Sequence, residues 1–207
     1  MRIKAIAGIC KKSKSICLVD KESSDGKHTA QWVGDAGAFY PVDGLPYMEM
    51  DGIFTIFEIA EVQKEKFSTQ HLPAVPEGGI TFEDTAPYEA RLESGDMTIN
   101  ADGRTLKPLQ TSRGLVFIDT KYLAPLAPLF DFLEFYERQM ASGRPYVAVK
   151  AGLILYAVIM PVNAIHDDFV KVLKEIAEQS IKTLARQKAE TEAGGGFMQE
   201  ALDAEGV

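Results

Sequence analysis

The amino-acid sequence predicts an α+β fold: a mainly antiparallel β-sheet in two similar β-rich halves, with a long C-terminal amphipathic helix. Short apolar runs alternate with Asp-Gly and other turn dipeptides through most of the 207 residues. The pattern of Gln31 to Val42 (QWVGDAGAFYPV) recurs in Val147 to Val162 (VAVKAGLILYAVIMPV), as strand, small-residue turn, strand, proline and valine. From residue 164 onwards the apolar residues instead recur at helical spacing.

The first half is predicted to begin with a β-hairpin. Apolar residues 3–9 and 15–20 flank a polar stretch that holds Lys11, Lys12 and Lys14. This pattern places the three lysines at the tip of the hairpin. It also places the only two cysteines of the chain, at positions 10 and 17, opposite each other on neighbouring strands.

The rest of the first half is predicted to be mostly strand. β-Branched and aromatic residues dominate 53–59 (IFTIFEI), which favours a strand there. Charged residues 61–70 predict a short helix. Two further strands are predicted at residues 28–33 and 38–42.

The second half follows a stretch rich in proline and glycine, residues 72–87, which predicts a crossover. Asp119 is predicted to cap a helix over 120–124, which Pro125 and Pro128 would end. The strands predicted in this half are residues 88–93, 97–101, 115–118, 132–136, 145–149 and 153–160, with a hairpin turn at 94–96 joining the first two.

Four segments follow from these elements. Residues 1–71 form the N-terminal β-rich half, and 72–87 the crossover. Residues 88–190 form the C-terminal half with the terminal helix, which is predicted over about 164–189. Residues 191–207, beginning near a run of three glycines, are predicted to be a flexible tail.

Composition and charge narrow the classes of function. The net charge of −8 argues against binding of nucleic acid or membranes by the whole surface, although it says nothing about local basic patches. No apolar run approaches the roughly 20 residues of a membrane-spanning helix. The first ten residues do not have the pattern of a signal peptide, so a cytoplasmic location is expected.

Motifs for catalysis or metal binding are not found in the sequence. The two cysteines are best explained as small buried thiols, and the three histidines are scattered without a partner at ligand spacing. Neither a phosphate-binding loop nor a nucleophile motif occurs. We therefore expect no catalytic residue, no metal and no cofactor, while an enzyme with an unrecognised site remains the third hypothesis.

Residues 115–162 resemble the last half-domain of the bacterial DNA polymerase sliding clamp, the beta subunit. A short strand leads into Thr120-Lys121-Tyr122-Leu123-Ala124-Pro125-Leu126, and a later hairpin ends at Met160-Pro161-Val162. The resemblance implies a clamp-like fold of two similar β-rich halves. It also implies that Met160, Pro161 and Val162 are part of a peptide-binding groove.

This chain departs from the clamp pattern in three respects. A clamp chain holds three domains, each built from two similar β-rich halves, whereas this chain has room for about one and a half domains. A closed ring would therefore need more subunits. Residues 163–207 follow where the clamp chain ends. The short helix offers only Lys121, whereas clamp helices that face DNA carry many cations.

The leading hypothesis is therefore a non-enzymatic protein-binding module with clamp-like architecture, accessory to a DNA transaction. The alternative is a self-associating scaffold unrelated to clamps. Partner identity, pathway and oligomeric state stay open. The candidate surfaces are Lys11, Lys12 and Lys14 for nucleic acid, and Tyr40, Tyr47, Met48, Phe169 and Leu173 for a protein partner or a second copy. Both sets of residues also have a simpler explanation. The three lysines are ordinary charge at a solvated hairpin tip, and Tyr40, Tyr47 and Met48 pack at the end of the core.

Overall fold

The computed structural model describes residues 2–22, 29–95, 97–162, 171 and 174–187. The chain divides into two compact units, Met1–Asn163 and Ala164–Val207. The fold is α+β, as the sequence predicts. In the described residues no helix is both long enough and apolar enough to span a membrane.

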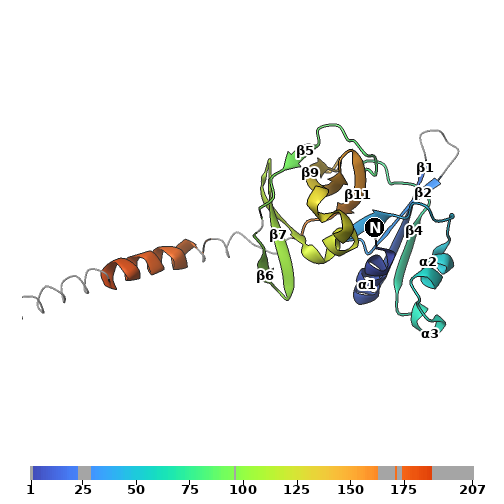
Figure 1. Ribbon diagram of the computed structural model, residues 1–207, viewed down its shortest axis with the longest axis horizontal. Helices are drawn as coiled ribbons and strands as arrows, with labels where there is room; N and C mark the ends of the chain where they lie inside the picture. Colours follow the sequence, from blue (N-terminus) through green and yellow to red (C-terminus); the bar gives the residue numbers. More distant parts are fainter. Residues whose placement is uncertain (1, 23–28, 96, 163–170, 172–173, 188–207) are drawn as a thin grey trace, which may run out of the picture. The chain divides into compact units, whose positions relative to one another are not determined.

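An eight-stranded mixed sheet forms the centre of the first unit (Figure 1). Its strands are β1 (Ser15–Glu22), β2 (Thr29–Gly34), β3 (Ala38–Pro41), β4 (Ser68–Leu72), β5 (Ala90–Leu92), β9 (Leu133–Gln139), β10 (Pro145–Ala151) and β11 (Ile154–Ile159). Their order is β4-β1-β2-β3-β11-β10-β9-β5. Among the described strands, β1 and β4 are parallel and every other pair is antiparallel.

A smaller antiparallel sheet lies beside it, in the order β6-β7-β8. These strands are β6 (Ile99–Ala101), β7 (Arg104–Thr111) and β8 (Gly114–Asp119). The sequence predicts that the strands at 88–93 and 97–101 form a hairpin, and this is wrong. β5 pairs with β9, and β6 pairs with β7. Both β9 and β7 are longer than β5 and β6.

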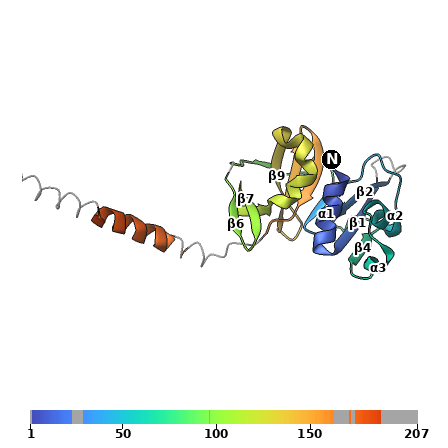
Figure 2. The same ribbon diagram turned by 60° about the horizontal axis from the view of Figure 1, so that its bottom comes forward.

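Helices cover one face of the large sheet (Figure 2). They are α1 (Ile3–Ser13), α2 (Met50–Ile56) and the 3₁₀ helix η1 (Thr120–Phe132), while the short α3 (Glu61–Lys64) has no buried residue. The Arg2 amide donates to the Pro125 carbonyl at 3.0 Å, which joins the start of α1 to η1. Ile6 from α1 and Leu126 from η1 are completely buried in one hydrophobic cluster with this face.

The crossover segment covers part of the opposite face. Phe82 is buried there, with its ring 4.7 Å from that of Trp32 and 5.7 Å from that of Phe39. Because both faces are covered, strands β1 and β10 are buried over five consecutive residues instead of alternating.

Buried cations of the sheet bind the crossover and the residues just after it. Arg138 and Lys150 are each 3% exposed, and both pair with Glu89, at 2.6 and 2.8 Å. Arg138 also donates to the backbone carbonyls of Glu83 at 2.8 Å and Asp84 at 3.1 Å. Two cations buried this deeply would destabilise the fold if they lacked these acceptors.

The predicted strand over residues 3–9 is wrong, because this segment is the helix α1. Ile6, Ala7, Ile9 and Cys10 are buried, a spacing of one face of a helix. Cys10 therefore packs on the helical face of the sheet and Cys17 on the other, and they are not paired across a hairpin. Both are free and buried, as predicted.

The predicted strand over residues 53–59 is also wrong. It overlaps α2, whose buried residues Ile53 and Phe54 are followed by buried Phe57 one turn later. The helix predicted over 61–70 is confirmed only at its start, since α3 ends at Lys64 and β4 follows. β-Branched and aromatic content favours strands, but the tertiary packing of an apolar helical face overrides it here.

The helix that follows Asp119 is longer than predicted. The Asp119 side chain does accept a hydrogen bond from the Lys121 amide, at 3.0 Å, which confirms its capping role. The helix continues through Pro125 and Pro128 to Phe132. It is a 3₁₀ helix, whose hydrogen-bond pattern differs from that of the α-helix on which the predicted stop was based.

In the second unit, residue 171 and residues 174–187 are helical, within the predicted terminal helix. The predicted start of that helix and its end at 189 lie outside the described residues, as does the predicted tail.

Candidate nucleic-acid interface

The N-terminal segment of the chain is strongly basic. Residues 2–14 contain five Lys or Arg and no Asp or Glu, in a chain whose net charge is −8. The buried side of α1 is apolar, so the charged residues lie away from it. The basic residues are Arg2, Lys4, Lys11, Lys12 and Lys14.

Lys11, Lys12 and Lys14 lie at the C-terminal end of α1, so the prediction of a hairpin tip is wrong. Lys12 and Lys14 are exposed and Lys11 is half-buried. Within the described part of the chain, none of the three forms an ion pair, and Lys14 lies 4.9 Å over the ring of Phe67. Cations at this end suit the helix dipole, but that stabilisation leaves their charge available to a ligand.

Another stretch of the first unit has the opposite charge. Residues 43–65 contain six Asp or Glu and one Lys. That lysine, Lys64, is engaged by Asp51 at 2.9 Å and Glu61 at 2.8 Å. These two segments of the first unit therefore carry opposite charge, and the basic segment is α1 with the residues that flank it.

A polar cluster around Asp20 holds the loop before α2. The carboxylate accepts hydrogen bonds from Gln31 at 2.8 Å and Tyr47 at 2.9 Å, and His71 Nε2 lies 3.0 Å from it. Burial alone would raise the pKa of Asp20, but these partners outweigh it and the pKa lies below its ordinary value. No sequence pattern predicts this cluster, because its members come from separate strands and a loop.

The predicted partner surface is divided by the structure. Tyr40 is fully buried, and its hydroxyl donates to the Tyr122 carbonyl at 2.8 Å. Burial raises the pKa of this phenol. Met48 is buried too, with its amide and carbonyl both bonded to the Gln31 side chain, at 2.8 and 3.0 Å. Tyr47, which is 53% exposed, is the accessible member of this set.

Met160, Pro161 and Val162 are half-buried. The Met160 amide donates to the Gly37 carbonyl at 2.8 Å, and the Val162 amide to the Phe117 carbonyl at 2.7 Å. These bonds join the end of β11 to the β2–β3 turn and to β8. Phe169 and Leu173 lie outside the described residues.

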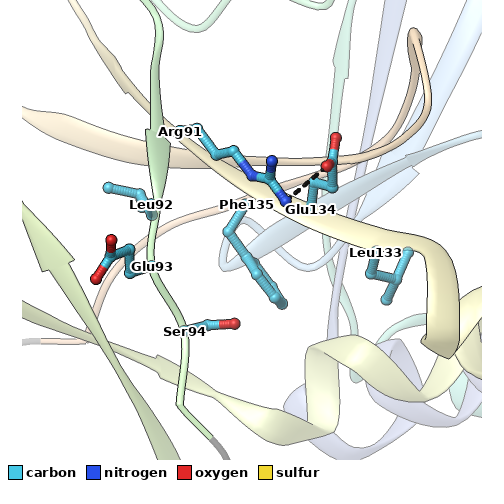
Figure 3. A pocket seen from close by; sticks show the side chains of 7 residues that line it. All are labelled: Arg91, Leu92, Glu93, Ser94, Leu133, Glu134 and Phe135. Carbon is cyan, nitrogen blue, oxygen red and sulfur yellow. Dashed lines mark ion pairs between the residues drawn. The ribbon is translucent and has the colours of Figure 1, made fainter.

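A pocket of about 580 Å³ is lined by the end of β5 with the two residues after it and by the start of β9 (Figure 3). Arg91 reaches across it to Glu134, with 2.8 Å between guanidinium and carboxylate, while Glu93 points away from that pair. The lining includes one hydroxyl, that of Ser94, and no His, Cys or Lys that could act as its base. The arrangement is that of an ion pair at a sheet edge, without the nucleophile and base of covalent catalysis.

Comparison of the chain with protein families, with characterised proteins and with solved structures finds no match. In the described residues there is also no cluster of three His, Cys, Asp or Glu that could hold a metal ion. The functional argument therefore depends on the geometry and charge of the chain itself.

Proposed function

We propose that this chain is a non-enzymatic binding module with sliding-clamp-like architecture, which contacts the backbone of nucleic acid through the basic segment 2–14. The observation that carries the proposal is the charge of this segment: five cations and no anion, on and beside one helix of an acidic protein. Nucleic-acid affinity comes mainly from neutralised phosphates, so a segment with five cations and no anion is the feature that favours binding.

The strand order supports the clamp-like part of the proposal. The central strands run β1-β2-β3-β11-β10-β9, so two sets of three consecutive strands meet at the β3–β11 pair. A helix precedes each set, α1 before β1 and η1 before β9, and both helices pack on the same face. The two segments with a shared sequence pattern, 31–42 and 147–162, occupy equivalent places in this order.

The nucleic-acid proposal is tested with a fluorescently labelled 20-base-pair duplex, by anisotropy over a series of salt concentrations. We expect binding at low salt that weakens linearly as log K against log salt. In the triple variant Lys4→Gln, Lys11→Gln, Lys14→Gln the slope should become shallower by about 2 to 3, because each lost phosphate contact removes about 0.9.

The matched control replaces three cations outside this segment: Lys66→Gln, Arg144→Gln and Lys174→Gln, all at exposed positions. It changes the net charge equally and should leave the slope unchanged. Equal effects of the two triple variants would mean that binding depends on overall charge and not on segment 2–14. Absence of binding by the wild type would refute the nucleic-acid proposal.

The clamp-like part makes a separate prediction about assembly. A chain with room for about one and a half clamp domains needs several copies to close a ring. Light scattering after size exclusion at several concentrations should give one discrete oligomer. A monomer at every concentration would remove the ring from the proposal and leave a monomeric binding module.

A further inference from the structure

A hollow of about 480 Å³ opens beside the C-terminal end of α1. Three parts of the chain that are distant in sequence line it: Lys12 of α1, the turn between β6 and β7, and the junction of β8 with η1. The lining residues are Lys12, Asp102, Gly103, Arg104, Thr105, Asp119, Thr120 and Lys121.

The hollow has an excess of accessible positive charge. Lys12 and Arg104 are exposed, and neither forms an ion pair or a side-chain hydrogen bond within the described residues. The third cation is Lys121, whose Nζ lies 3.7 Å from a carboxylate oxygen of Asp119 and 4.5 Å over the Tyr122 ring. Three cations therefore converge on one concave site.

Both acidic residues of the lining have a role in local structure. Asp119 is buried, and its side chain accepts the Lys121 amide at the start of η1. Asp102 and Gly103 both have positive φ, 51° and 70°, the geometry of a two-residue hairpin turn in which Asp-Gly is favoured. Local structure therefore accounts for the presence of both acidic residues in the lining.

The turn also leaves room for a ligand. A Cβ atom built on Gly103 would meet nothing within 4 Å, so the backbone is open to close approach. The Thr120 hydroxyl lines the same hollow, whereas the Thr105 hydroxyl donates its proton to the Asn100 side-chain oxygen at 2.9 Å. Guanidinium, ammonium and hydroxyl groups together suit the oxygens of a phosphate group.

We propose that this hollow seats a phosphate group of the nucleic-acid backbone, held by Lys12, Arg104 and Lys121. This inference rests on the proposed function, since Lys12 makes the hollow continuous with the basic segment. Arg104 is the residue suited to a bidentate contact, because its planar fork matches two phosphate oxygens.

The test compares the full-length double variant Arg104→Gln, Lys121→Gln with the wild type, in the same duplex titration. We expect a slope shallower by about 0.9, because one phosphate contact is lost. Arg104→Lys keeps the charge and should keep the slope while weakening the affinity, which separates the fork from simple charge. Because Arg104 is exposed, this single variant should fold as the wild type does, so its change in affinity tests the phosphate seat even if the double variant is destabilised.

The control is Lys66→Gln, Arg144→Gln, which should behave as the wild type. If the wild type binds the duplex and the double variant has an unchanged slope, the phosphate seat is refuted and the function of α1 stands. If the wild type does not bind, both proposals fail. A parallel titration with sodium pyrophosphate distinguishes the source: binding of pyrophosphate lost in the double variant, with an unchanged duplex slope, would assign the hollow to a free phosphate compound and overturn the backbone assignment.

Discussion

The set α1-β1-β2-β3 and the set η1-β9-β10-β11 each place a helix and three antiparallel strands in the same sheet, but they differ in helix type and in their buried charges. α1 is an α-helix with lysines on its open side, whereas η1 is a 3₁₀ helix with two prolines and two exposed phenylalanines near its end, Phe130 and Phe132. The first set buries the Asp20 cluster, and the second buries Arg138 and Lys150.

The shared order of elements therefore depends on the apolar side of each helix and not on its open side. Ile6 and Leu126 are equally buried although their helices differ in type. The open side is then free to carry charge in α1 and apolar residues in η1. A functional surface on α1 therefore needs no change in the core.

The largest effect is expected in the second set, from Glu89→Ala. This change leaves Arg138 and Lys150 buried without their carboxylate, and should lower the free energy of unfolding by about 3 kcal/mol or more. The measurement is urea unfolding followed by circular dichroism. Glu89→Gln, which keeps an acceptor, should lose less. A loss below about 1 kcal/mol would mean that the carbonyls bonded to Arg138 suffice.

An intermediate effect is expected in the first set, from Asp20→Asn. At neutral pH this variant should lose about 1 to 3 kcal/mol, because Asp20 accepts several hydrogen bonds while almost completely buried. Since the pKa of Asp20 is lower in the folded than in the unfolded state, its contribution is complete above the unfolded pKa of about 4 and is lost as the pH falls through the folded pKa.

Unfolding measured from pH 7 down to pH 2 should therefore bring the wild type and Asp20→Asn together in stability. Tyr47→Phe, which removes one of the hydrogen bonds to Asp20, should show a smaller version of the same convergence. A difference that stays constant with pH would contradict an ionised, hydrogen-bonded Asp20.

The smallest effect is expected from Gly8→Ala, which tests the helix type in the first set. Gly8 is exposed within α1, and an added Cβ would meet nothing within 4 Å. Alanine in the middle of an α-helix is favoured over glycine, so the variant should be more stable by about 0.5 to 1 kcal/mol. The change in melting temperature measures it, and destabilisation would contradict α1.

Elements with local sequence signals could be predicted before the structure was known. Asp-Gly turns, β-branched runs and the capping position of Asp119 were sufficient to predict most strands and the start of η1. The α1 and α2 segments could not be predicted in this way, because a short apolar run fits both periods. Ile3 and Ile9 agree with a strand, whereas Ile6 and Cys10 complete a helical face.

The contacts between charged residues, in contrast, depend on the fold of the whole first unit. The hollow joins Lys12 with Arg104 and Lys121, and the buried cluster joins Glu89 with residues 138 and 150. No local pattern predicts such sets, since their members belong to different elements and approach one another only when the sheet has formed. The basic composition of the α1 segment is visible in the sequence. The position of its lysines, at the end of a helix and not at the tip of a hairpin, follows from the packing of α1 against the sheet.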